Sequence, residues 1–117
     1  MAILIFIGGF LFFNSNMLQK KVISANFLSS ISPGTSSVLE VKLFNPGEKK
    51  SIHLFVKADS PKVNISPSQQ EDFFGGGETR LFRFTVSLAP DALKGSYAID
   101  IFALELNESL RVYFEVA

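Results

Sequence analysis

The chain has 117 residues and no cysteine, and its 11 Lys and Arg balance its 11 Asp and Glu. This length suits one domain that buries about two-thirds of its unfolded surface without cross-links, and the missing cysteines exclude disulfides and thiolate metal sites. A nucleic-acid partner is not expected, because neutralising phosphates needs a concentrated basic face.

The first residues form an apolar segment. Residues 1–19 carry no charged side chain, and residues 2–13 are apolar apart from two glycines. A cleaved secretory signal would fit this apolar length, but the basic start and the small-residue cleavage site of such signals are missing. A membrane anchor over residues 1–18 would be about 27 Å long as a helix, just short of a hydrocarbon layer of ~30 Å.

A third interpretation of this segment is assembly, either as a strand given to a neighbouring subunit or as a helix in a filament core. For the anchor, Lys20 and Lys21 would favour a cytoplasmic C-terminal side by the positive-inside rule, which conflicts with the extracytoplasmic location inferred below. All three interpretations stay open. The sequence divides into an apolar segment, residues 1–20, and a domain, residues 21–117.

The rest of the chain predicts strands separated by turns. Phe82, Phe84 and Val86 alternate with polar residues, and this period of two gives a strand with one buried face. Glycine, proline and asparagine mark the turns between such segments. We predict an all-β, seven-stranded antiparallel sandwich of immunoglobulin-like type. Its strands are expected near residues 22–28, 38–44, 52–57, 63–65, 79–88, 96–105 and 110–116.

The inward positions of these strands define the expected core. Each position lies at period two within its strand, so a slip of one residue would expose the whole set together. The predicted core residues are Leu39, Val41, Leu43, Ile52, Leu54, Val56, Phe82, Phe84, Val86, Tyr97, Ile99, Ile101, Val112 and Phe114.

The candidate chemical groups do not converge on a catalytic site. His53, the only histidine, falls on the outward face of its strand without partners at positions that predict a triad or a metal site. The glycines at residues 75–77 precede a strand and predict a turn rather than a phosphate-binding loop. Nearby Glu71, Asp72 and Glu78 lack the fixed spacing of a calcium loop. We expect no enzyme activity, metal or cofactor.

Two asparagines match the N-glycosylation pattern. They are Asn64, followed by Ile65 and Ser66, and Asn107, followed by Glu108 and Ser109. Asn107 is the more accessible candidate because it falls at a predicted turn. Use of either site would support a location outside the cytoplasm.

The turn residues also resemble those of a known group of modules. The resemblance covers about residues 32–103 and is to the immunoglobulin-like modules related to CARDB and to the domain beside the carbohydrate-binding module of some α-galactosidases. Such modules recur in archaeal and bacterial envelope and S-layer-associated proteins and share no catalytic residues, so the resemblance implies a non-catalytic module of the cell envelope. It rests on Ser32-Pro33-Gly34-Thr35, Phe44-Asn45-Pro46-Gly47, Gly77-Glu78, Ala89-Pro90-Asp91-Ala92 and Lys94-Gly95-Ser96-Tyr97.

A looser similarity is to archaeal archaellum accessory proteins and pilin-like subunits, which place a hydrophobic N-terminal segment ahead of a β-sandwich. In this chain the segment is shorter than theirs and carries no visible processing site. The similarity implies an alternative function, in which the chain is a subunit of an extracellular filament and residues 1–18 make the subunit contacts.

One sheet face is predicted to bind a protein partner. The third, sixth and seventh strands of an immunoglobulin-like sandwich share a sheet, and their outward residues here are more apolar than a solvated face requires. Scattered surface apolar residues are also ordinary. The partner could be another subunit, an S-layer neighbour or the chain's own N-terminal segment, with aromatic anchors at the centre and charges at the rim. The predicted interface residues are His53, Phe55, Asp100, Phe102, Leu104, Arg111 and Tyr113.

Overall fold

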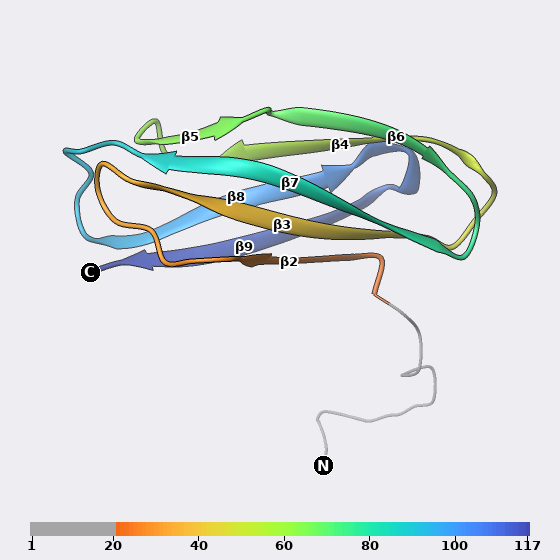
Figure 1. Cartoon of the computed structure of the whole chain (residues 1–117), viewed down its shortest axis with the longest axis horizontal. Helices are drawn as coiled ribbons and strands as arrows, with labels where there is room; N and C mark the ends of the chain where they lie inside the picture. Colours follow the sequence, from red (N-terminus) through yellow and green to blue (C-terminus); the bar gives the residue numbers. More distant parts are fainter. Residues whose placement is uncertain (1–20) are drawn as a thin grey trace, which may run out of the picture.

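The computed structural model describes residues 21–117, which form two antiparallel sheets packed face to face (Figure 1). The first sheet has the strand order β2-β3-β7-β5 and the second has the order β6-β4-β8-β9. This confirms the predicted immunoglobulin-like sandwich, with eight strands in place of seven. The strands are β2 (Ile23–Phe27), β3 (Ser36–Asn45), β4 (Lys50–Ala58), β5 (Val63–Ser66), β6 (Gln69–Phe74), β7 (Glu78–Leu88), β8 (Gly95–Ala103) and β9 (Glu108–Val116).

The additional strand is β6, which the sequence pattern did not predict. Phe74, at its end, is its one buried residue, so the strand lacks the apolar alternation of the others. It pairs with β4 at an edge of the second sheet, whereas β5 pairs with β7 at an edge of the first. The chain therefore crosses between the sheets from Ser66 to Gln69.

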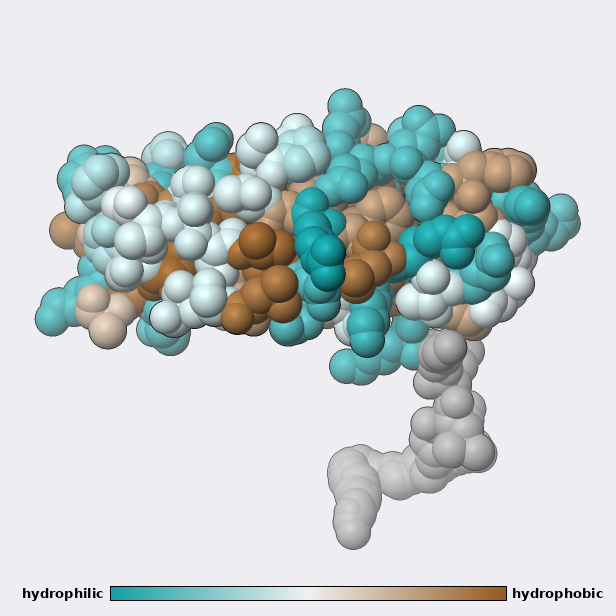
Figure 2. Space-filling model, viewed as in Figure 1, coloured by the Kyte–Doolittle hydropathy of each residue, from teal (hydrophilic) through white to brown (hydrophobic). Residues whose placement is uncertain are grey.

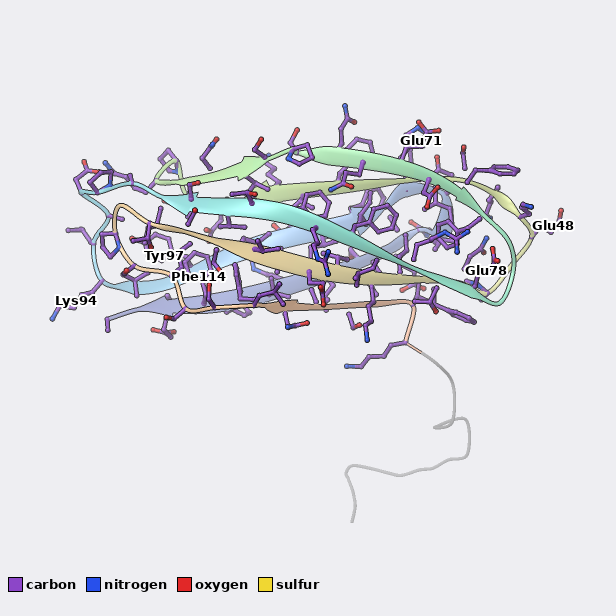
Figure 3. All side chains as sticks on the ribbon, viewed as in Figure 1. Glu48, Glu71, Glu78, Lys94, Tyr97 and Phe114 are labelled. Carbon is purple, nitrogen blue, oxygen red and sulfur yellow. The ribbon has the colours of Figure 1, made fainter. Side chains whose placement is uncertain are left out.

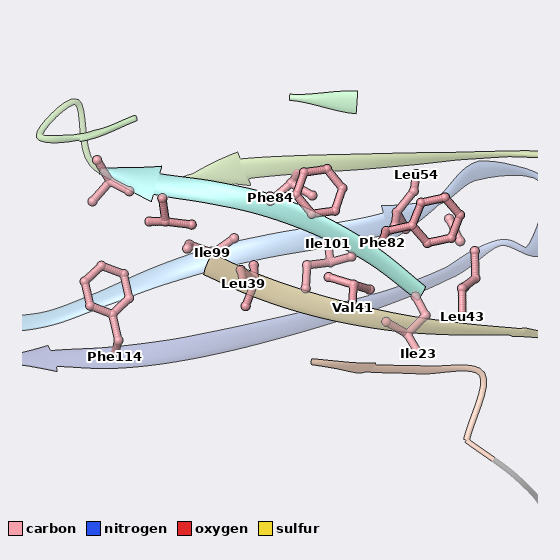
Figure 4. Packing of buried hydrophobic residues seen from close by; sticks show 14 of the residues in the cluster. Ile23, Leu39, Val41, Leu43, Leu54, Phe82, Phe84, Ile99, Ile101 and Phe114 are labelled. Carbon is pink, nitrogen blue, oxygen red and sulfur yellow. The ribbon is translucent and has the colours of Figure 1, made fainter. Parts of the chain in front are cut away.

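The core lies between the two sheets (Figure 4). All predicted core residues are buried except Tyr97 and Val112, which are half-buried and pack against the core from its rim. Val112 lies on the edge strand β9, where no further strand covers its outer side among residues 21–117. Tyr97 lies near the start of β8, and its hydroxyl donates to the backbone oxygen of Leu93 at 2.5 Å.

Aromatic rings join the sheets along the side where β2 faces β9. The rings of Tyr97 and Phe114 stack with their centroids 5.5 Å apart. Phe27 of β2 meets Phe114 of β9 edge to face at 5.2 Å. Offset and edge-to-face pairs add about 0.5–1.5 kcal/mol beyond burial of their area, so this cluster stabilises the contact between β2 and β9.

Asn45 connects two turns at one end of the sandwich. Its buried side-chain amide donates to the backbone oxygens of Glu48 at 2.8 Å and Phe74 at 3.1 Å, and its Oδ1 accepts the Gly47 N–H at 2.9 Å. A Cβ atom on Gly76 would lie 2.0 Å from the Gly47 carbonyl oxygen. The glycines of residues 75–77 form the predicted turn, and close contact with the β3-β4 turn requires the middle one.

Residues 1–20 lie outside the described residues. The signal, anchor and assembly interpretations all fall on them, as does the boundary at residue 20. Within residues 21–117, no helix has the length and apolar character needed to cross a membrane.

Candidate functional site

The predicted interface residues come together on the outer face of the second sheet. Strands β4, β8 and β9 share this sheet, as predicted, and their register places Phe55 opposite Phe102 and Asp100 opposite Arg111. The unpredicted strand β6 lies on the other side of β4, with Glu71 opposite His53. The face is therefore one strand wider than expected.

Phe55 and Phe102 form the centre of this face. Both side chains are half-buried, and the rings of His53 and Phe55 stack at 6.4 Å with an interplanar angle of 17°. Cross-strand aromatic pairs stabilise a sheet by roughly 0.2–1 kcal/mol. Phe55 and Phe102 therefore contribute to the fold while presenting apolar surface to a partner.

More exposed apolar residues surround this pair. Tyr113 of β9 is 64% exposed and Leu104 is 50% exposed. The expectation that Leu104 extends a strand over residues 96–105 is wrong, because β8 ends at Ala103 and a short 3₁₀ helix, η2 (Leu104–Leu106), follows. Phe73 of β6, 58% exposed, was missed because its strand was not expected.

Asp100 and Arg111 form an ion pair on this face. Nη1 of Arg111 donates to both carboxylate oxygens of Asp100, at 2.9 and 3.0 Å, and Nη2 lies 3.4 Å from Oδ2 of Asp59. The guanidinium carbon also lies 5.7 Å from the centroid of the Tyr113 ring. The charge of Asp100 raises the pKa of Arg111. The face thus has a fixed charged row beside its apolar centre.

His53 is held between two carboxylates. Its Nδ1 lies 2.6 Å from Oε2 of Glu105, its backbone N–H donates to Oε1 of Glu105 at 2.6 Å, and its Nε2 lies 3.2 Å from Glu71. The hydrogen bond to Glu105 and the two negative charges raise the pKa of His53, although burial opposes this shift. Burial also acts to raise the pKa of Glu105, but the hydrogen bonds from His53 outweigh it and the pKa is lowered.

Neither partner of His53 was predicted from the sequence. Glu71 lies on the unpredicted strand, and Glu105 lies in η2, beyond the end of β8. The sequence signal that could have placed Glu71 is the pair Phe73-Phe74 ahead of the glycine turn. An apolar pair at this point predicts one side chain in the core, and therefore a strand that brings Glu71 beside β4.

Beside His53 lies a shallow, open hollow of about 370 Å³. Its lining residues are His53, Gln69, Gln70 and Glu71, and none of them carries a hydroxyl or a thiol. A nucleophile next to a base is the geometry that covalent catalysis requires. Over residues 21–117, no three His, Asp or Glu side chains are arranged to hold a metal ion. The site can bind a proton and exchange hydrogen bonds, and this hollow brings no hydroxyl or thiol to the histidine.

The side chains also distinguish the two ends of the sandwich. Figure 3 shows Glu48, Glu71 and Glu78 towards one end and Tyr97 and Phe114 towards the other. The end with Glu48 and Glu78 includes the turns that Asn45 connects, and the His53 site lies near it.

The outer face of the first sheet is more mixed. It faces the viewer in Figure 2, where brown groups lie among teal and white ones. Leu81 is 46% exposed, and an ion pair of 3.1 Å joins Arg83 to Glu40 across β7 and β3. A second hollow, of about 180 Å³, is lined by Lys21, Ser24, Lys42, Phe44 and Thr79.

Both glycosylation candidates are accessible. Asn64 is exposed on the edge strand β5. Asn107 is exposed between η2 and β9 with a φ of 51°, so its predicted position at a turn is confirmed. Asparagine adopts this left-handed conformation more readily than most residues.

Comparisons with known proteins give only distant likenesses of fold. No protein-family model matches the chain, and no curated protein matches it. Among solved structures, the chain is similar to SSP-19, an MSP-domain protein like family member in Caenorhabditis elegans, with a TM-score of 0.47 and 10% sequence identity. The match covers 76% of this chain and 94% of that one.

Proposed function

We propose that this chain is a non-catalytic binding module of the cell envelope that contacts a protein partner through the outer face of the second sheet. One observation carries the proposal. The exposed large apolar side chains Phe73, Leu104 and Tyr113 lie on or beside this face around the half-exposed pair Phe55 and Phe102, whereas Leu28 and Leu81 are the exposed large apolar residues on or beside the outer face of the first sheet within residues 21–117.

The chemistry of the face fits a protein contact. Interface centres are rich in aromatic residues and poor in unpaired charge, and their rims are polar. Here Phe55 and Phe102 lie at the centre, and the charge of Arg111 is already compensated by Asp100. A partner can cover this face without burying an unpaired guanidinium, which would oppose binding.

The location and the non-catalytic role rest on separate observations. The turn residues resemble those of envelope modules, and the apolar residues 1–18 would serve as a membrane anchor. His53 is ion-paired, and no hydroxyl or thiol lines the hollow beside it. These features support a binding module over an enzyme.

Site-specific photo-crosslinking in the native cells tests the proposal. A benzophenone amino acid is placed in the full-length chain at Leu104 or Phe73, and at Leu81 and Leu93 as exposed controls away from the face. We expect adducts of one defined mass from the first two positions and none from the controls. Equal adduct formation from Leu81 would contradict the proposal.

Affinity measurements with the partner identified by cross-linking then give the contribution of the face to binding. Replacing Phe55 and Phe102 together by serine should weaken association by a few kcal/mol, as loss of central aromatic anchors does. Because both rings are half-buried, unfolding of the double variant must be measured alongside. Tyr113→Ser removes an exposed ring with little effect on stability, so unchanged affinity in both variants would count against the face.

The second candidate function is a subunit of an extracellular filament. The observation that favours it is the uncharged, apolar stretch of residues 1–19, which could make contacts between subunits. Flotation with lipid vesicles separates the two candidates. An anchored module floats with the vesicles, whereas a filament subunit sediments as polymer in the absence of lipid.

A further inference from the structure

The edge strands of the two sheets differ in how well they are protected. Edges expose unpaired backbone groups, and proteins protect them with short strands, prolines and charged side chains. Strand β5 has four residues between Pro61 and Pro67, and β2 has five. Strand β6 has six residues and carries two acidic ones. Strand β9 has nine residues and no proline, and it pairs only with β8 among the strands of residues 21–117.

Two of the three charged residues of β9, Arg111 and Glu115, lie on its outward face, are of opposite sign and are spaced so that the strand complements itself. Outward side chains of paired strands must stay on one face, which restricts the registers that two copies can adopt. If Tyr113 lies opposite Tyr113 of a second copy, Arg111 falls opposite Glu115 of that copy. The twofold axis repeats this contact. Centring the pair on Arg111 would instead bring two guanidinium groups together.

We propose that β9 pairs antiparallel with β9 of a second copy of this chain, about a twofold axis at Tyr113. The two four-stranded second sheets then become one sheet of eight strands. This goes beyond the proposed function, because it assigns the edge of the sheet to self-association and leaves the outer face for a different partner.

The exposure and the existing contacts of the β9 side chains are compatible with such pairing. Glu115 is exposed and has no ion-pair partner within the described part of the chain. Arg111 uses Nη1 and Nη2 for Asp100 and Asp59, and its guanidinium also lies over the ring of Tyr113. The inward residue Val112 is half-buried and packs against the core. In this register it would lie opposite Phe114 of the second copy, and the added strand would cover its open side.

Introduced cysteines test the register directly, because the chain has none of its own. Tyr113→Cys in the full-length protein, kept in mild detergent so that residues 1–20 do not drive association, should form a disulfide-linked dimer on oxidation. Glu115→Cys is the matched control, on the same strand and the same face. In the proposed register the two Glu115 positions are four residues apart along the strand, about 13 Å, whereas a disulfide spans Cα atoms about 4.4–6.8 Å apart.

A mixture of the Arg111→Cys and Glu115→Cys proteins should give the mixed dimer. A monomeric Tyr113→Cys protein, or equal cross-linking of Tyr113→Cys and Glu115→Cys, would overturn the proposal. Because Tyr113 is 64% exposed, circular dichroism should show an unchanged fold in the variant.

The charge pattern gives a second measurement. Glu115→Arg should raise the dimer dissociation constant of the full-length protein about fivefold to tenfold in sedimentation, since each ion pair becomes a like-charge contact. Glu48→Arg, an exposed change of the same charge in the β3-β4 turn, should leave the constant unchanged. An equal effect of the two substitutions would reject the register. If dimerisation fails while Leu104 still gives photo-adducts, the proposed function stands and this inference falls.

Discussion

At the scale of single residues, His53 links the stability of the domain to pH. The folded protein holds the imidazole proton more tightly than the unfolded chain, because Glu105 and Glu71 raise the pKa of His53 above 6.5. A group with a raised pKa contributes its full stabilisation below the unfolded value and loses it as the pH rises through the folded value. The stabilisation by His53 is therefore present in mildly acidic solution and is lost as the pH rises above 6.5.

The variant His53→Gln should lack this dependence. In urea titrations at about pH 6 and about pH 9, the unfolding midpoint of the unchanged protein should be lower at the higher pH. The midpoint of the variant should change less between the two. Glu105→Gln should reduce the difference as well, because it removes the strongest partner of the imidazole. An identical pH response in all three proteins would show that the pair does not stabilise the fold.

Asn45 is the second residue with a testable role. Asn45→Ala removes three hydrogen bonds and leaves the buried backbone oxygen of Phe74 without its side-chain donor. Such a loss costs about 1–3 kcal/mol in the free energy of unfolding. Asn26→Ala, an exposed change on β2, should alter it by less than about 0.5 kcal/mol. Equal effects in urea denaturation would mean that Asn45 does not hold the two turns together.

The part of the candidate site that follows from the alternation of side chains along the strands was predictable from the sequence. The alternation along β4, β8 and β9 placed Phe55, Phe102 and Arg111 on one face, and the structure agrees. The contacts of His53 depend instead on residues distant in sequence. Glu105 is 52 positions away, in a helical turn that alternation along β8 does not predict.

At the scale of elements, β6 shows why an edge strand is hard to recognise. Both sides of such a strand meet water along most of its length, so its sequence need not alternate. Residues Gln69–Phe74 carry four polar residues before two phenylalanines, and only the last is buried. The seven predicted strands were recognisable because each carries inward apolar residues at period two.

Two adjacent phenylalanines test the attachment of β6. Phe74 is fully buried, so Phe74→Ala should lower the free energy of unfolding by about 3–5 kcal/mol. Phe73 is 58% exposed and lies under the ammonium group of Lys49, so Phe73→Ala should cost less than about 1 kcal/mol. Thermal or urea unfolding measures both. Similar losses would mean that the strand is held by its backbone pairing rather than by Phe74.

At the scale of the whole molecule, the described residues contain a complete core. The buried apolar cluster extends from Ile23 to Val116 and draws on both sheets. A chain lacking residues 1–20 should therefore fold and unfold cooperatively, as measured by circular dichroism during urea titration. If this chain is unfolded and a peptide of residues 1–18 restores it, strand donation between subunits replaces the anchor interpretation.

The unequal flanks of the sandwich limit how many copies can join. On one flank both edge strands, β5 and β6, are short and carry prolines or acidic residues beside them, whereas the other flank contains the long edge of β9. A molecule that pairs through β9 alone has a valence of one, and a symmetric pair uses up that valence. Raising the concentration should then saturate a dimer without growth of fibres, and any longer assembly needs a contact of a different kind, from the outer sheet face or from residues 1–18.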